Sequence, residues 1–206
     1  FQEIFSSKCS LIMDFDGTIA DTSEIHNQAF KEIFTEYSIE FEYKELAGMS
    51  TKDAISKSLN IAKIKINTSI INKLVLKKQN TARDLIKSTD LLTSIPGSID
   101  FIKWAKQFFH LSIASSGSRE TVKLALDKLG IHEYFKIIVC SEDVQRSKPE
   151  PDIFIETMNK GNFKRQECII FEDSDAGIKA AKASKIDYID IRDQSFDSIN
   201  QMLKIL

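Results

Sequence analysis

The stretch Leu11-Ile12-Met13-Asp14-Phe15-Asp16-Gly17-Thr18 decides how the rest of the chain is interpreted. Its apolar beginning, together with Ser10, predicts a short buried strand that ends in two carboxylates separated by one residue. Side chains two residues apart on an extended chain point the same way, so Asp14 and Asp16 are expected to converge beyond the strand. Gly17 lets the backbone turn sharply there. Paired carboxylates beside an apolar strand cost free energy unless a cation or a shared proton compensates them, which indicates a chemical site.

The composition is that of an ordinary globular chain. Of the 206 residues, 42% are hydrophobic and 28% are charged, with a net charge of −2. This balance predicts no nucleic-acid or anionic-membrane partner. No apolar run has the length of a membrane span and no signal-peptide pattern is present, so we expect a cytoplasmic protein, most simply a monomer. The cysteines show no disulfide or metal spacing and are expected to be reduced thiols: Cys9, Cys140 and Cys168.

The stretch from Asp21 to Ile95 predicts a compact helical insert. Three runs in it show helical spacing of apolar residues, the last of them from Ile70 to Ile86 with a possible break near Asn80. The stretch contains no proline and one glycine, Gly48, and it is too long for an unstructured loop. We therefore expect residues 22–92 to form a helical cap domain, inserted into a core made of residues 1–21 and 93–206.

The core sequence alternates between short apolar strands and amphipathic helices. Alternation of this kind is typical of an α/β fold, here a doubly wound parallel sheet, Rossmann-like, with helices on both faces. The sequence predicts five strands, at residues 10–13, 111–114, 137–140, 168–171 and 188–191.

Polar clusters follow the predicted strands, where ligand sites of such sheets lie. The residues concerned are Asp14, Asp16, Ser115, Ser116, Lys148, Glu172 and Asp173. Carboxylates in this number suit Mg²⁺, which shares its coordination sphere with water and phosphate oxygens. Lys148 and the amides after Ser115, at a helix N-terminus, suit a phosphate dianion. Together these features predict phosphoryl transfer on a small phosphorylated metabolite.

Four segments resemble the four motifs of the haloacid dehalogenase superfamily: Asp14-Phe15-Asp16-Gly17-Thr18, Ser115, Lys148-Pro149-Glu150-Pro151-Asp152 and Glu172-Asp173-Ser174-Asp175. They occur in the family's order and spread over most of the predicted core. The insert resembles the helical cap of the branch that contains β-phosphoglucomutase and small-metabolite phosphatases.

The resemblance implies a role for each matched residue. Asp14 would be the nucleophile that forms an aspartyl-phosphate, and Asp16 the general acid and base. Ser115 and Lys148 would hold the transferring phosphoryl group, with Ser116 beside them. Mg²⁺ would be bound by Asp14, the backbone carbonyl of Asp16, Glu172 and Asp173. Closure of the insert would exclude water, with hinges near residues 21–22 and 96–97.

Several residues of the insert are candidates for substrate contacts, although each also has an ordinary structural interpretation. His26 lies near the predicted hinge and could contact substrate or Asp16. The loop that starts at Gly48 could enter the site with Ser50, Thr51 and Lys52, or it could simply connect two helices. Lys77 and Lys78 are interpreted as a solvated helix face, and Ser118 and Asp175 as helix N-caps.

Hydrolysis of a phosphomonoester is the favoured reaction, and a sugar-phosphate mutase is the alternative. In β-phosphoglucomutase an arginine at the position of Thr51 grips the distal phosphate, and a second cap lysine is replaced here by Gln79. A mutase must hold a bisphosphorylated intermediate, so missing cap cations favour the phosphatase. A phospho-accepting signalling domain is a further alternative, but that class has its acceptor on a later strand and lacks a helical insert.

Overall fold

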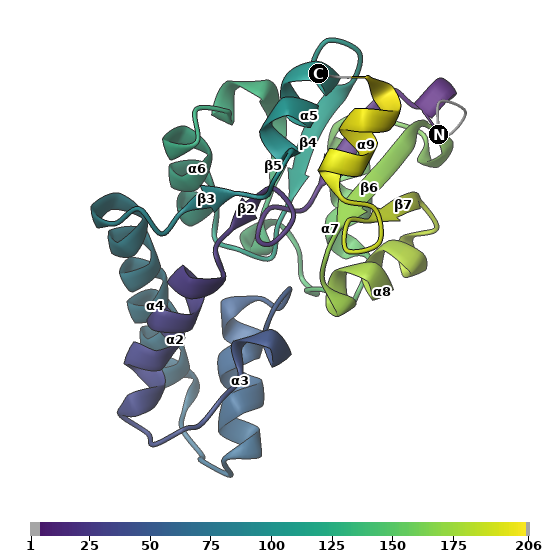
Figure 1. Ribbon diagram of the computed structural model, residues 1–206. Coiled ribbons are helices and arrows are strands. Elements are labelled where there is room, and N and C mark those ends of the chain that lie inside the picture. The colour runs from purple at the N-terminus through teal and green to yellow at the C-terminus, as the bar shows by residue number, and fades with distance from the viewer. Residues whose placement is uncertain (1–4, 205–206) are drawn as a thin grey trace.

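The computed structural model describes residues 5–204 and shows a parallel sheet between two layers of helices, with a helical insert beyond one end of the sheet (Figure 1). The sheet has five strands in the order β5-β4-β1-β6-β7, and every neighbouring pair is parallel. The strands are β1 (Ser10–Met13), β4 (His110–Ala114), β5 (Phe135–Val139), β6 (Cys168–Glu172) and β7 (Asp187–Asp190). The predicted α/β fold is confirmed.

Strand β1 lies at the centre of the sheet and is buried on both faces. Leu11 and Met13 belong to the larger hydrophobic core, whereas Ile12 belongs to the core on the opposite face. A strand covered on both sides must be apolar throughout, which explains its unbroken hydrophobic run. The strand order changes direction at β1, between β4 and β6, and such a switch point is where doubly wound sheets bind ligands.

Helices cover both faces of the sheet (Figure 1). The larger core includes residues from α5 (Ser98–Ala105), α6 (Arg119–Lys128) and α9 (Phe196–Leu203). The smaller core includes residues from α7 (Asp152–Lys160) and α8 (Asp175–Ser184). Short 3₁₀ helices join these elements at η2 (His132–Tyr134), η3 (Ser141–Asp143) and η4 (Arg165–Glu167).

The insert consists of α2 (Ser23–Thr35), η1 (Tyr43–Glu45), α3 (Thr51–Ile61) and α4 (Thr68–Ser88). These helices share a hydrophobic core of their own, built around Phe30, Phe34 and Ile55. Helix α4 continues through Asn80, so the possible break there is absent. Ala82 and Ile86, near the end of α4, belong to the larger core of the sheet domain, and this packing attaches the insert to the core.

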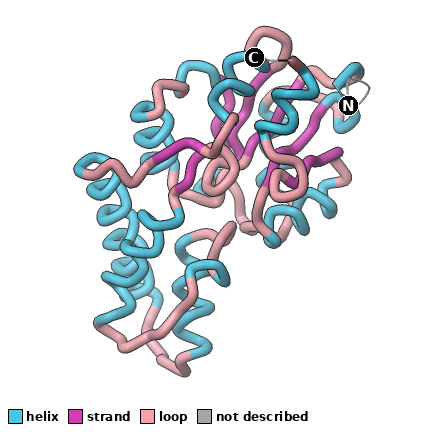
Figure 2. Tube along the Cα trace, viewed as in Figure 1, coloured by secondary structure: helices cyan, strands magenta, loops and turns pink. Residues whose placement is uncertain are grey.

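Two very short strands connect the core to the insert (Figure 2). Strand β2 (Ala20–Asp21) pairs antiparallel with β3 (Thr93–Ser94), close to the predicted hinges. Neither this two-stranded pairing nor α9 was predicted from the sequence, because each element offers only a short apolar pattern. Among residues 5–204, no helix combines the length and the apolar character that a membrane span requires.

Candidate active site

Asp14 follows directly on β1 and is 4% exposed. Its backbone N–H donates to the Phe171 carbonyl (3.0 Å), so the pairing with β6 continues past the end of the strand. Gly17 then turns the chain at a φ of 90°. A Cβ at this position would lie 2.2 Å from Asp173 Oδ2, so both the backbone and the neighbouring carboxylate require glycine here.

The amine of Lys148 lies among buried carboxylates. Its Nζ donates to Asp14 Oδ1 (2.5 Å), to Glu172 Oε1 (2.7 Å) and to the Ala114 carbonyl (3.2 Å), which uses all the donors of an ammonium group. Burial by itself lowers the pKa of Lys148, but the carboxylates of Asp14 and Glu172 outweigh it and raise that pKa. Lys148 is therefore a fixed positive charge against the predicted nucleophile.

Glu172, at the end of β6, is fully buried and held by several donors. Its Oε2 accepts hydrogen bonds from the backbone amides of Asp173 and Ser174 (2.6 Å each) and from the Ser174 hydroxyl (3.1 Å). Gly177 makes room for the carboxylate, because a Cβ there would lie 1.8 Å from Glu172 Oε1. The arrangement leaves Oε1 facing Lys148.

Asp14, Glu172 and Asp173 each offer a carboxylate oxygen, and these oxygens lie within 4.8 Å of one another. Burial, and then the charge of Glu172, raises the pKa of Asp173 to about 7. Burial and the neighbouring carboxylates raise the pKa of Asp14 as well, although Lys148 opposes this. Crowded carboxylates of this kind are compensated by a divalent cation, and oxygen donors suit Mg²⁺. These residues fit the predicted magnesium site, whereas the side chain of Asp16 is directed elsewhere.

The Asp16 carboxylate contacts residues of the insert and of the loop after β4. Oδ1 accepts from the Thr22 hydroxyl (2.8 Å) and lies 3.0 Å from His26 Nε2, and Oδ2 accepts from the Ser115 hydroxyl (3.2 Å). Burial opposes ionisation of Asp16, but His26 and Thr22 outweigh it and lower the pKa of Asp16 to about 2. In the free protein Asp16 is therefore an ionised carboxylate.

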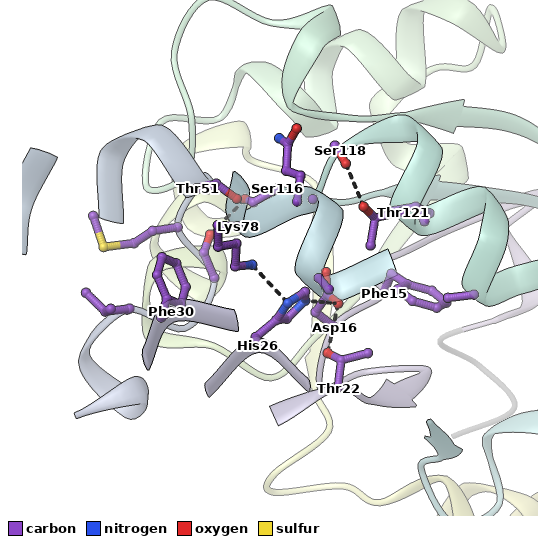
Figure 3. A pocket seen from close by; sticks show the side chains of 18 of the residues that line it. Phe15, Asp16, Thr22, His26, Phe30, Thr51, Lys78, Ser116, Ser118 and Thr121 are labelled. Carbon is purple, nitrogen blue, oxygen red and sulfur yellow. Dashed lines mark hydrogen bonds and ion pairs between the residues drawn. The ribbon is translucent and has the colours of Figure 1, made fainter. Parts of the chain in front are cut away.

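Lys78 extends this set of contacts, and its position corrects the interpretation of Lys77 and Lys78 as a solvated pair. Lys77 is partly exposed, but Lys78 is buried, with its Nζ 2.9 Å from His26 Nδ1 (Figure 3). A charged amine can only donate, so Nδ1 accepts and the His26 proton resides on Nε2, facing Asp16. Burial, and then the charge of Lys78, lowers the pKa of His26. The sequence did contain a signal for this, because the buried side chains of α4 recur every fourth residue: Leu74, Lys78, Ala82 and Ile86.

Two serines in the loop after β4 form hydrogen bonds to Asp16 and to the insert. The hydroxyl of Ser115, besides donating to Asp16, accepts from the Gly117 amide (2.9 Å). The hydroxyl of Ser116 donates to the carbonyl of Gly48 in the insert (2.7 Å). Ser116 therefore joins the loop after β4 to the loop before α3.

Of the two predicted N-caps, Ser118 is confirmed as the N-cap residue of α6, and the prediction for Asp175 is wrong. Ser118 occupies the cap position of α6, but its hydroxyl pairs with the Thr121 hydroxyl (2.8 Å). Helix α8 is capped by Ser174, and Asp175 is instead an exposed residue in an ion pair with Arg192 (2.7 Å).

The candidate substrate contacts of the insert occupy different environments. His26 lies against Asp16. The hydroxyl of Ser50 caps α3 by accepting from the Asp53 amide (3.2 Å). Thr51 lines the cavity above Asp14, whereas Lys52 is exposed and borders an outer groove.

Two spaces between core and insert border the site and share lining residues. The inner cavity has a volume of about 40 Å³ and its lining includes Asp14, Asp16 and His26 (Figure 3). The outer groove measures about 1190 Å³, and Thr51 and Gln79 line both spaces. Small-molecule sites usually measure roughly 300–1,000 Å³. The inner cavity, beside Asp14 and Asp16, is therefore smaller than such sites usually are.

Comparison with known proteins agrees with this geometry. The model of the haloacid dehalogenase-like hydrolase family matches residues 11–191. The fructose-1-phosphate phosphatase YqaB of Escherichia coli (strain K12) is 26% identical over 191 residues, covering 92% of this chain and 99% of that protein. The β-phosphoglucomutase of Bacillus subtilis (strain 168) is 30% identical over 183 residues, covering 85% of this chain and 79% of that protein.

Among solved structures, CbbY from Rhodobacter sphaeroides in complex with phosphate has a TM-score of 0.78 and 26% sequence identity, covering 87% of this chain and 84% of that chain. The family match spans nearly the whole chain and contains the strand-end residues Asp14, Lys148 and Asp173. The chain therefore belongs to the haloacid dehalogenase-like hydrolase family.

Proposed function

We propose that the protein is a Mg²⁺-dependent phosphatase that hydrolyses a small sugar-like phosphomonoester through an aspartyl-phosphate. The observation that carries the proposal is the hydrogen bonding of the Asp14 carboxylate. Lys148 holds its Oδ1, and Oδ2 has no hydrogen-bond partner among residues 5–204, so one carboxylate oxygen is free to attack. The similarity to fructose-1-phosphate phosphatase supports the choice of substrate class.

The first chemical step joins Asp14 to the phosphoryl group. Asp14 Oδ2 attacks phosphorus, the bond from phosphorus to the leaving oxygen breaks, and that oxygen takes a proton from Asp16. Lys148 and the Ser115 hydroxyl would orient the phosphoryl oxygens, each giving up one of its present hydrogen bonds to do so. When bound at Asp14, Glu172 and Asp173, Mg²⁺ would reduce the repulsion between the nucleophile and the phosphate.

The second step releases inorganic phosphate. Asp16, now a carboxylate, removes a proton from water, the water oxygen attacks phosphorus, and Asp14 is regenerated. Because the pKa of Asp16 in the free protein is about 2, it must gain a proton before the first step. An anionic phosphate bound beside Asp16 raises the pKa of its carboxyl, which couples protonation to substrate binding.

We also propose that residues 22–92 act as a cap that closes over the core formed by residues 1–21 and 93–206. The support is the Ser116–Gly48 hydrogen bond and the shared lining of the inner cavity. His26 and Lys78 come from this cap, so the proton-transfer group is complete only in the closed state.

Release of phosphate from a panel of sugar phosphates tests the phosphatase assignment. Asp14→Asn is expected to lower kcat by at least about 10³-fold, because it removes the nucleophile. Excess EDTA should also abolish turnover, and Mg²⁺ should restore it. Asp175→Asn is the matched control, since Asp175 is exposed and pairs with Arg192 outside the acidic cluster. Full activity of Asp14→Asn or of the chelated enzyme would refute the mechanism.

A sugar-phosphate mutase is the second candidate, favoured by the 30% identity to β-phosphoglucomutase. The two activities differ in the fate of the phosphoryl group, which a mutase returns to the sugar. With glucose 1-phosphate as substrate, we expect release of inorganic phosphate to exceed formation of glucose 6-phosphate. The opposite ratio would assign the mutase activity instead.

A further inference from the structure

We propose that Arg119 and Asp143 are positioning residues, which hold together the two loops that bind the transferring phosphoryl group. These loops are the β4 loop (residues 115–118, directly after β4) and the β5 loop (residues 140–151, between β5 and α7). Each of them carries one of the residues that would orient the phosphoryl oxygens. The inference rests on the proposed phosphatase function and adds to it two residues on which the geometry of the phosphate site depends.

The β5 loop needs an anchor, because Lys148 lies far along it from the end of β5. Between η3 and Lys148 the chain passes through Gln145 and Arg146, which are both exposed. The amine of Lys148 is nevertheless buried and donates to Asp14 (2.5 Å). Helix α7 fixes the far end of the loop, so the position of this amine also depends on how the near end is held.

The two loops are paired through their backbones beyond the ends of the strands. The backbone N–H of Ser115 donates to the Val139 carbonyl (3.0 Å), and that of Ser141 donates to the Gly117 carbonyl (3.1 Å). The pairing of β4 with β5 therefore continues into both loops. Hydrogen bonds set the separation of the loops at the point where the phosphate-binding residues begin.

Arg119, the first residue of α6, reinforces this connection from the side of the β4 loop. Its Nη1 donates to the Ile138 carbonyl (2.9 Å), and its Nη2 donates to the Asp143 carboxylate. Its backbone N–H also reaches the β5 loop, where it donates to Glu142 Oε1 (3.1 Å). The guanidinium is planar and rigid, so it fixes its two acceptors in one geometry. A residue directly after the β4 loop thus holds both the end of β5 and η3.

Asp143 holds η3 from the side of the β5 loop. Its Oδ2 accepts from the Cys140 amide (2.8 Å), and its Oδ1 accepts from the amine of Lys160 in α7 (3.2 Å). Burial opposes ionisation of Asp143, but these two donors and Arg119 outweigh it and lower the pKa of Asp143. The carboxylate is therefore charged at neutral pH, and it joins η3 to both α6 and α7.

The ion pair between Arg119 and Asp143 is too exposed to contribute much to stability. The two side chains are 35% and 19% exposed, and an ion pair in such surroundings adds little to the free energy of unfolding. The geometry of a phosphate site is more sensitive, because a displacement of about 1 Å can lower the rate by a factor on the order of 10². We therefore expect loss of the pair to affect catalysis more than folding.

The first test removes the charge of each partner, in Asp143→Asn, Arg119→Gln and the double variant. With p-nitrophenyl phosphate as substrate, we expect each single variant to lower kcat/KM by roughly 10- to 100-fold, while the midpoint of urea unfolding stays near that of the wild type. The double variant should lose no more activity than the weaker single variant, because the two side chains act as a unit. Arg119→Lys keeps the charge but cannot hold two acceptors at once, so its loss should be intermediate.

Inhibition by orthovanadate, which occupies the phosphoryl site, separates positioning from a merely structural effect. In Asp143→Asn and Arg119→Gln the inhibition constant should rise about as much as kcat/KM falls, because both quantities depend on the same phosphate-binding geometry. A smaller fraction of folded enzyme would instead lower kcat and leave the inhibition constant unchanged.

Arg192→Gln and Asp190→Asn are the matched controls. Arg192 pairs with Asp190 (2.6 Å), and their side chains are 45% and 15% exposed, close to the values for the proposed pair. This second pair lies at the end of β7 and joins neither of the two loops. Both control variants should retain kcat/KM within a factor of two.

The proposal is overturned if Asp143→Asn and Arg119→Gln retain the kcat/KM of the wild type, or if their inhibition constants for orthovanadate do not rise. It is equally overturned if the control variants lose as much activity. Absence of phosphate release by the wild type would instead refute the phosphatase function, on which the proposal rests.

Discussion

Burial of Lys78 disfavours the charged form of its amine. Burial lowers its pKa from 10.5 to about 8, and the charge of Asp16 opposes only part of this effect. In the unfolded chain the pKa stays near 10.5, so between about pH 8 and 10.5 the unfolded chain binds more protons than the folded protein. Stability should therefore rise with pH across this window, and below pH 8 the full penalty of the buried charge is present.

Lys78→Met is expected to stabilise the protein at pH 7 by about 2 kcal/mol. The pKa of Lys78 is 10.5 in the unfolded chain and about 8 in the folded protein, so removing the amine should raise the free energy of unfolding by about 3 kcal/mol. Loss of the hydrogen bond to His26 should lower it by about 1 kcal/mol. The gain should be mostly lost near pH 10.5, where the amine is neutral in the folded protein and half neutral in the unfolded chain. Urea unfolding at pH 7 and pH 10.5 measures both values. Lys77→Met, on the more exposed side of the same helix, is the control, and a destabilised Lys78→Met at pH 7 would contradict the argument.

At the scale of elements, the loop between η1 and α3 lies directly against the core. Gly48 in this loop has a φ of 76°, and its carbonyl accepts from the Ser116 hydroxyl. A Cβ on Gly48 would lie 2.3 Å from Ser174 Oγ, which belongs to the core. The loop can approach the core this closely only because residue 48 has no side chain.

Gly48→Ala is therefore expected to impair turnover more than stability. The left-handed backbone costs about 1 to 2 kcal/mol for alanine, and the contact with Ser174 additionally prevents full closure. Misplacement of the cap should lower kcat/KM by roughly 10- to 100-fold. Gly130→Ala is the matched control, because Gly130 has a φ of 68° but open space around it. Equal losses of activity in the two variants would show that the loop contact is not needed for turnover.

At the scale of the whole molecule, we expect access to Asp14 to require movement between the insert and the sheet domain. The insert has its own core around Phe30 and Phe34, and it joins the sheet domain through the paired strands β2 and β3 and the end of α4. Ile25 and Ala29 of α2 belong to the core of the sheet domain together with Ala82 and Ile86 of α4, so a rotation at the connecting strands must rearrange these contacts. Because the inner cavity measures only about 40 Å³, we expect such a rotation to admit a substrate.

Small-angle X-ray scattering should detect this motion. We expect the free protein to have a larger radius of gyration than the closed structure, because open forms contribute to the average. Orthovanadate with Mg²⁺, a mimic of the transferring phosphoryl group, should bring the value down to that of the closed structure. An unchanged radius of gyration on saturation with orthovanadate would argue against cap closure.

Much of the core and its site could be predicted from local sequence. Strands covered on both faces need unbroken apolar runs, and such runs are visible before Asp14, Ser115 and Glu172. In a parallel sheet the polar residues after these runs meet at one edge, so their proximity followed from the topology alone. Lys148 could be placed with them only through the motif it shares with the family, because a loop separates it from its strand.

The contribution of the insert depended on tertiary structure. Lys78 and Gln79 lie on α4, and its amphipathic pattern shows which residues face inward but not what they face. The docking of α4 against the core, through Ala82 and Ile86, turns Lys78 toward His26. Local sequence thus determined the positions of Asp14 and the acidic cluster, because these residues directly follow strand ends. The contacts of Asp16 with His26, and of His26 with Lys78, were decided only by the packing of the insert against the core, since they join residues of separate elements.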